Sequence, residues 1–312
     1  AGVELRLLGK GPGMDLSCVS RLRAVIREVR PQVIHTHLHA LKYAALALGG
    51  GKIPILHTVH NQADAEAVKL DQLIARYLFH SGKATPVALS GEIQASIVAL
   101  YGLPESRVPV VCNGIDLDRC LRKTEYGLHY PPRLIHVGRF YPQKNHEAIA
   151  RIFYEVQKKQ PEARLCLIGD GELKEQIHEK FQEYGILDKV IFAGVCPDVE
   201  RYLSAMDVFL FPSLFEGLPF TLLEAQANGL PCVVSDRITE EAVITEKIIS
   251  SLSLERSDEE WASAVIAAAK KGREDKEAAV RAIEMAHFDI HQEAGRLLEL
   301  YEKQGEKHGK QN

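Results

Sequence analysis

Short apolar segments alternate with amphipathic segments along almost the whole chain, and this alternation limits the fold more than any other feature. Most of the apolar segments are rich in β-branched residues, which is typical of parallel strands covered on both faces. We predict strands at residues 3–8, 33–37, 55–59, 85–89, 108–111, 133–137, 164–168, 190–193, 208–212 and 232–235. Helical patterns fill the gaps at residues 15–30, 38–48, 64–80, 91–101, 145–160, 172–184, 199–205, 219–228 and 258–271. This repetition predicts an α/β protein with doubly wound parallel sheets.

A polar segment without periodicity interrupts the alternation at residues 118–133 and ends in Pro131-Pro132. Five predicted strands lie on each side of it, and 312 residues are enough for about two domains. We therefore expect two Rossmann-like domains, at residues 1–122 and 123–288. We expect a C-terminal helix at about 289–303 to pack back on the first domain, and residues 304–312 to form a polar tail.

The composition excludes several classes of protein. Hydrophobic residues make up 46% of the chain and charged residues 26%, which argues against a disordered protein. The net charge of −4 disfavours a globally basic nucleic-acid binder. The six cysteines are scattered without a CxxC pair, as expected for reduced thiols in a cytoplasmic protein. The longest nearly apolar stretch, Tyr43 to Gly51, is too short to span a bilayer.

The most informative segment joins a predicted strand to a predicted helix at residues 209–229. Pro219 suits the first turn of that helix, and Gly229 suits the position just past its end. The N–H groups around Leu218 and at 220–222 would form an anion site at the carboxyl end of a strand, where open α/β sheets bind ligands.

Two acids, Glu216 and Glu224, lie in this segment. A carboxylate beside a phosphate site repels the phosphate, so this placement makes sense if both acids accept hydrogen bonds from sugar hydroxyls. Alternatively, Glu216 is a helix-start acid and Glu224 a solvated helix residue.

A second strand-to-helix turn carries two cations. Arg139 and Lys144 flank a short loop that opens at Gly138. An arginine can bind a diphosphate as a fork and a lysine as a point charge, although both could simply be surface charges. Glycines in the weaker turns at Gly169 and Gly194 would let the backbone approach a ligand closely.

Together these segments resemble the retaining glycosyltransferases of family 4, also called group 1 glycosyltransferases. The resemblance rests on Glu216-x7-Glu224 with EGLP, on G-R-F-x-x-x-K-N from Gly138, on the G-D-G-E turn from Gly169, and on N-G-I-D from Asn113. It runs from about residue 32 to residue 224. The resemblance implies the GT-B fold, in which two Rossmann-like domains face across a cleft.

The resemblance also implies roles for individual residues. The C-terminal domain would bind a nucleotide-sugar, with Arg139 and Lys144 on its diphosphate and Glu224 on its ribose. Glu216 and the amides of 217–220 would hold the transferred sugar, and backbone near Val195 would meet the base. The full donor-binding set is Gly138, Arg139, Lys144, Gly169, Val195, Glu216, Gly217, Leu218, Phe220, Thr221, Leu222 and Glu224.

Histidines cluster in the first half of the chain, at His35, His37, His39, His57 and His60. Alternating histidines could suggest metal ligands, but a strand sends alternate residues to one face and no cysteine or acid is nearby. We expect neither a metal nor a cofactor, because the resemblance implies that lysine and arginine stabilise the leaving group.

His60 matches the family's histidine near the transferred sugar, which implies an orienting or polarising role; otherwise it is a structural strand-end histidine. The residues expected in catalysis are His60, Arg139, Lys144 and Glu216. The histidines at 35–39 would border the acceptor side or be structural.

We therefore predict a glycosyltransferase that moves a hexose or N-acetylhexosamine, with retention, to a saccharide or lipid-linked saccharide. The resemblance is closest to exopolysaccharide-synthesis members, and UDP is the favoured donor nucleotide, with GDP-mannose second. The alternatives are a GT-B nucleotide-sugar epimerase and a non-catalytic nucleotide-sugar-binding protein.

Two further expectations concern the first domain. Arg23, Arg27 and Arg30 share one side of a predicted helix, which could contact anionic lipid at the inner face of the plasma membrane or simply be solvated.

Family members begin with a strand, a glycine-rich loop and a helix before the position that corresponds to residue 3. We therefore expect an N-terminally truncated acceptor domain that transfers sugar poorly.

Overall fold

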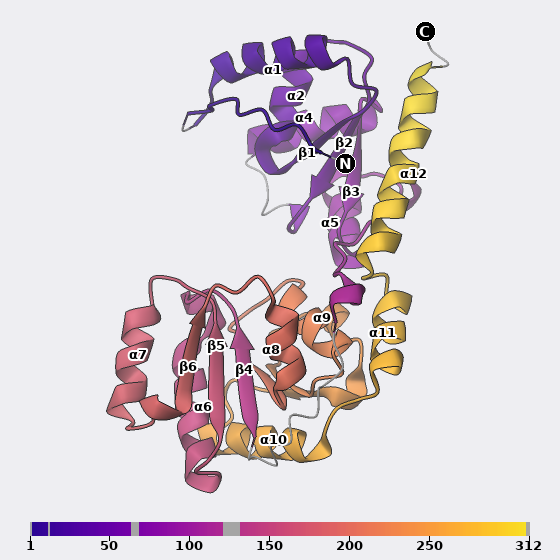
Figure 1. The fold of residues 1–312 in the computed structure, drawn as a ribbon. Coiled ribbons are helices and arrows are strands. Elements are labelled where there is room, and N and C mark those ends of the chain that lie inside the picture. The colour runs from indigo at the N-terminus through magenta and orange to yellow at the C-terminus, as the bar shows by residue number, and fades with distance from the viewer. Residues whose placement is uncertain (1, 12, 64–68, 121–131, 310–312) are drawn as a thin grey trace. The chain divides into compact units, whose positions relative to one another are not determined.

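The computed structural model describes residues 2–11, 13–63, 69–120 and 132–309. The chain forms two compact units, one made of residues 1–113 and 292–312 and the other of residues 114–291 (Figure 1). Among the described residues, no helix is both long enough and apolar enough to cross a bilayer.

The first unit is built on a parallel sheet with the strand order β1-β2-β3. The central strand is buried at every position, including its two polar residues His57 and Thr58. The strands are β1 (Ile34–His37), β2 (Ile55–Val59) and β3 (Ala84–Ala88). The helices are α1 (Leu16–Val29), α2 (Leu41–Leu48), α4 (Lys69–His80) and α5 (Gly91–Tyr101).

The last helix of the chain, α12 (Ile290–Gly309), returns to this unit from Gln292 onward. Its side chains Leu297 and Leu300 pack against Leu56 of the central strand. Residues 304–309, which we expected in a polar tail, continue this helix.

Two strands predicted in the first unit differ in the structure. Residues 3–8 form no strand, and Val3, Leu5 and Leu7 are exposed. Their alternating pattern is not sufficient, because a strand also needs a neighbour that pairs with its backbone groups. Residues 108–111 are reduced to a single bridge between Ala88 and Val110, and the ladder cannot extend because Pro109 has no N–H to donate.

The second unit is built on a six-stranded parallel sheet with the order β6-β5-β4-β7-β8-β9. Figure 1 labels the neighbouring strands β6, β5 and β4 of this sheet. The first strand of this unit along the chain, β4, lies in the middle of the sheet. Strands β5 and β6 follow on one side of it and β7, β8 and β9 on the other, which is the doubly wound Rossmann arrangement. The strands are β4 (Arg133–Val137), β5 (Arg164–Ile168), β6 (Val190–Gly194), β7 (Val208–Phe211), β8 (Cys232–Ser235) and β9 (Ile249–Leu252).

Helices cover both faces of this sheet, and a separate apolar core lies under each layer. The layers are α6 (His146–Lys159), α7 (Lys174–Glu183) and α10 (Asp258–Lys271) on one face, and α8 (Val199–Ala205) and α9 (Phe220–Ala227) on the other. A further helix, α11 (Lys276–Met285), packs on α9. The strand β9 and the helix α11 were not predicted from the sequence.

The chain leaves the first unit at Asn113, nine residues before the predicted boundary at 122, and returns at Gln292. Within the second unit, Ile115 N–H donates to the carbonyl of Phe288 at 2.8 Å, which ties residues 114–120 to this unit. Most of the predicted linker, residues 121–131, lies outside the described residues.

Candidate active site

Three glycine turns lie side by side at the carboxyl ends of β4, β5 and β6. Gly138 N–H donates to the carbonyl of Ile168 at 2.9 Å, and Gly169 N–H donates to the carbonyl of Gly194 at 2.8 Å. The structure therefore brings together the turns at 138, 169 and 194–195 that the sequence singled out separately. Val195, which follows the third turn, is 79% exposed.

Two hydrogen bonds join the loop after β4 to the loop after β7. These two strands are the neighbours at which the strand order reverses. Gln143 Nε2 donates to the carbonyl of Phe215, and Asn145 Nδ2 donates to the carbonyl of Pro212, both at 3.0 Å. Neither side chain was assigned a role from the sequence, although both lie inside the G-R-F-x-x-x-K-N segment. Their bonds fix the loop that carries Arg139 and Lys144 against the loop that carries Glu216.

Lys144 and Glu216 form an ion pair in which Nζ lies 2.7 Å from Oε1. Their side chains are only 18% and 8% exposed, and the Lys144 ammonium also lies 4.8 Å from the centre of the Phe211 ring. Each charge offsets the cost of burying the other. The Lys144 ammonium therefore neutralises the Glu216 carboxylate in this structure.

Arg139 lies in the same loop as Lys144 and is exposed, with its guanidinium 5.5 Å from the centre of the Tyr141 ring. It can turn toward a bound anion without breaking an ion pair seen in the described structure.

Two buried histidines that the sequence analysis overlooked lie beneath the same loop. His136 and His146 are fully buried and meet edge to face, with ring centroids 4.8 Å apart. Burial lowers the pKa of both, to about 4 for His146, and the nearby Lys144 charge lowers them further. Both rings are therefore neutral at pH 7, so Arg139 and Lys144 supply the positive charge at this loop.

The start of α9 corrects one sequence prediction. Leu222 N–H donates to the carbonyl of Pro219 at 3.0 Å, so it is not free for an anion. No described backbone acceptor pairs with the N–H groups of Phe220 and Thr221, and these remain available. The buried hydroxyl of Thr221 also has no partner among the described residues. Gly229 lies just past the end of the helix, as the sequence predicted, and has a φ of +65°, in the left-handed region.

Glu224 lies one turn into α9 and is not a fully solvated residue. Burial raises its pKa to about 7, the charge of Glu200 adds to this, and Arg119 opposes it. Arg119 binds Glu200 directly at 2.7 Å. Hydrogen bonds from ligand hydroxyls would favour the ionised form of Glu224.

Several histidines of the first unit contact one another or the hydroxyl groups of neighbouring side chains. His37 Nδ1 lies 2.9 Å from His60 Nε2, at the ends of β1 and β2. His35 bonds the hydroxyls of Thr58 and Tyr301, each at 2.7 Å, and so links α12 to the sheet. Within the described ranges, these histidines do not bring three ligand atoms close enough for a metal. Three exposed residues of the other unit do so: Asp116, Asp118 and His291.

Comparison with known proteins agrees with this geometry. Residues 125–286 match the family described as "Glycosyl transferases group 1", and residues 2–119 match "Glycosyltransferase Family 4". EpsF of Bacillus subtilis (strain 168) is 30% identical over 95% of this chain and 82% of its own length. A UDP-Gal:alpha-D-GlcNAc-diphosphoundecaprenol alpha-1,3-galactosyltransferase of Escherichia coli is 28% identical over 71% of this chain and 62% of its own.

Among solved structures, HepE of Anabaena in complex with UDP superposes with a TM-score of 0.73 and 18% identity. The match covers 92% of this chain and 82% of HepE. At that identity the likeness concerns the fold, and it confirms the predicted GT-B architecture with two Rossmann-like domains.

Proposed function

We propose, because this chain belongs to the family 4 (group 1) glycosyltransferases, that it transfers a sugar from a UDP-linked donor to a hydroxyl of a saccharide or lipid-linked saccharide, with retention of configuration. The observation that carries the proposal is the partly buried Lys144–Glu216 pair, which joins the loops after β4 and β7 at the switch point of the sheet. The UDP bound to HepE and the lipid-diphosphate acceptor in the name of the E. coli relative support it. We place the product in bacterial exopolysaccharide or other surface-polysaccharide synthesis, at the cytoplasmic side.

Each group at the site has a part in this proposal. Lys144 and Arg139 bind the diphosphate, Glu224 binds the ribose, and the backbone near Val195 meets the base. Glu216, released by Lys144, accepts hydrogen bonds from the transferred sugar, aided by the amides of Phe220 and its neighbours. His60 orients that sugar. Two cations replace a metal in this scheme, so EDTA should not slow transfer.

Retention limits the mechanism. A double displacement needs a carboxylate nucleophile under the anomeric carbon, and we nominate no acid of the first unit for that role. We favour a front-face reaction, in which the bond from the anomeric carbon to the diphosphate breaks as the acceptor oxygen attacks from the same side. The acceptor proton passes to the departing phosphate oxygen, and Lys144 and Arg139 stabilise the charge that develops there.

A thermal-shift screen against UDP, GDP, ADP and their sugars tests the donor assignment. We expect UDP and UDP-sugars to raise Tm most, because a ligand that binds only the folded state stabilises it by mass action. A larger shift with GDP or GDP-mannose would refute the uridine assignment. Acceptor-free conversion of UDP-N-acetylglucosamine to its epimer would favour the epimerase alternative, and tight UDP binding without any turnover would favour the non-catalytic one.

The pH dependence of donor binding tests Glu224. Its pKa of about 7 in the free protein means that the carboxylate is mostly protonated at pH 6 and mostly ionised at pH 8. If ribose hydroxyls bind the ionised form, the affinity for UDP-glucose should rise about tenfold over this interval. UDP-glucose is the suitable probe because it lacks the terminal phosphate that titrates near pH 6 in UDP. Isothermal titration of Glu224→Gln should give a flat profile, and an unchanged slope in this variant would assign the effect to another group.

Peripheral contact with an anionic membrane is also a proposal, and it concerns two of the three arginines at positions 23, 27 and 30. Arg23 donates to the carbonyls of Ala47 and Leu46 at the end of α2, so it is occupied within the unit. Arg27 and Arg30 remain exposed on α1 and its C-cap. Liposome co-sedimentation that does not depend on anionic lipid would remove this proposal.

A further inference from the structure

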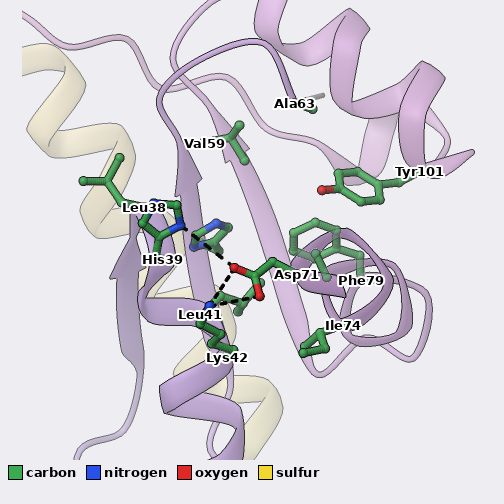
Figure 2. Close-up of a pocket in the computed structure, with 12 residues that line it drawn as sticks. Leu38, His39, Leu41, Lys42, Val59, Ala63, Asp71, Ile74, Phe79 and Tyr101 are labelled. Carbon is green, nitrogen blue, oxygen red and sulfur yellow. Dashed lines mark hydrogen bonds and ion pairs between the residues drawn. The ribbon is translucent and has the colours of Figure 1, made fainter. Parts of the chain in front are cut away.

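A small pocket lies between α2 and α4 of the first unit, at the carboxyl ends of β1 and β2 (Figure 2). Its volume is about 30 Å³, enough for roughly one or two water-sized groups. Buried side chains form its inner wall, among them His57, Phe79 and Tyr101. Leu38 and His39, which are exposed, border it on the solvent side. The pocket is therefore a narrow recess for one small chemical group.

The polar part of the pocket is an ion pair between two helices. Lys42 Nζ lies 3.0 and 2.8 Å from the two carboxylate oxygens of Asp71, and the side chains are 20% and 13% exposed. His39 Nδ1 lies 4.0 Å from Asp71 Oδ2. Dashed lines in Figure 2 mark the interactions of Asp71 with Lys42 and His39. An ammonium has three N–H donors, and a carboxylate has about four positions that accept hydrogen bonds. The two bonds between Lys42 and Asp71 use two of these donors and two of these acceptor positions. Both groups can thus bind a hydroxyl without losing each other.

The pocket adjoins the histidine pair at the end of the sheet. Leu38 has φ of +52°, a left-handed conformation that is uncommon for a residue other than glycine. This turn separates His37, which contacts His60, from His39, which lies near Asp71. The same three-residue segment therefore connects the proposed catalytic His60 to the mouth of the pocket.

We propose that this pocket binds the hydroxymethyl group of an acceptor hexose and so contributes to acceptor specificity. The inference rests on the proposed function and names a substrate group that the first unit recognises. The oxygen of a hydroxymethyl group stands one carbon beyond the sugar ring, so it reaches further into a small recess than a hydroxyl attached directly to the ring. Its carbon would contact the aromatic wall of Phe79 and Tyr101, and its oxygen would meet Lys42 and Asp71.

The charges favour a neutral group over a phosphate. One ammonium and one carboxylate cancel, and burial lowers the pKa of His57 to about 4, so its ring is neutral at pH 7. A phosphate would compete with Asp71 for Lys42 and would be repelled by the carboxylate. A hydroxyl can donate to Asp71 and accept from Lys42 at the same time, which adds hydrogen bonds to this partly buried pair.

The test compares hexosides with their 6-deoxy counterparts. The probes are methyl β-D-galactopyranoside and methyl β-D-glucopyranoside, each against its 6-deoxy analogue, titrated by NMR into the full chain with UDP present. We expect at least one hexoside to bind ~10- to 100-fold more tightly than its deoxy analogue. Asp71→Asn and Lys42→Met should weaken the hexoside and erase the difference. Glu28→Gln, which breaks the exposed pair with Arg6 in the same unit, should preserve it.

Equal affinity for hexoside and deoxy analogue in the wild type, no detectable binding of either hexoside, or a preference that survives in Asp71→Asn would each overturn the inference. UDP affinity and far-UV circular dichroism of both variants should match the wild type, which separates a lost contact from a lost fold. The binding comparison does not depend on turnover. A chain that prefers the hexoside but transfers no sugar would count against the proposed function alone.

Discussion

Replacing Lys144 with alanine should lower kcat by on the order of 10²-fold, the largest effect that we expect from one side chain at the active site. In the proposed reaction, the ammonium stabilises charge that develops on the departing diphosphate, and the two neutral histidines below it cannot take over this role. The ion pair with Glu216 holds Lys144 in place before the donor arrives. Steady-state UDP release in the presence of acceptor measures the loss.

The variant needs controls, because removing Lys144 leaves the buried carboxylate of Glu216 without its partner. Lys144→Met with Glu216→Gln keeps the site neutral and should remain as slow as the single variant. Glu216→Gln alone should retain UDP affinity, since it frees Lys144, but should lose turnover of the UDP-sugar. Lys158→Ala, which breaks the exposed pair with Glu155, is the surface control. Wild-type turnover by folded Lys144→Ala would exclude the role assigned to Lys144.

The inner strands of the second unit, β4, β5, β7 and β8, were predicted well because they are buried on both faces at almost every position. Burial on both sides leaves nearly unbroken apolar runs, such as Val208–Phe211, and those runs are visible without a structure. The edge strand Ile249–Leu252 was not predicted, because it is only half buried and contains two serines. Residues 3–8 were wrongly predicted to form a strand. Their alternating pattern is that of a strand, but no described strand pairs with them.

The site was predictable only in its local parts. Each strand-to-helix turn carries its own residue pattern, so Arg139, Lys144 and Glu216 could be singled out one by one. Their pairing could not, because 72 residues separate Lys144 from Glu216, and only the sheet order places β4 beside β7. The neutral state of His136 likewise depends on burial by elements distant in the sequence.

Gly169 shows how one residue can serve both the fold and the site. The sequence suggested that this glycine allows a ligand to approach the backbone. The structure adds a stronger requirement, because a Cβ at this position would lie 2.1 Å from the carbonyl oxygen of Gly138, and φ is +139°. That oxygen belongs to the loop that carries Arg139 and Lys144, and a backbone atom there cannot move away on its own.

We therefore expect Gly169→Ala to lower the free energy of unfolding by roughly 3 kcal/mol or more, and UDP affinity by at least about tenfold because the displaced loop carries both cations. Gly185→Ala is the matched control: its φ of +67° is also positive, but nothing lies within 4 Å of the added carbon. It should cost only about 1 kcal/mol, from backbone conformation alone, and leave UDP binding unchanged. Urea unfolding and titration with UDP measure both quantities. Equal destabilisation of the two variants would mean that conformation, and not contact with Gly138, explains the glycine at 169.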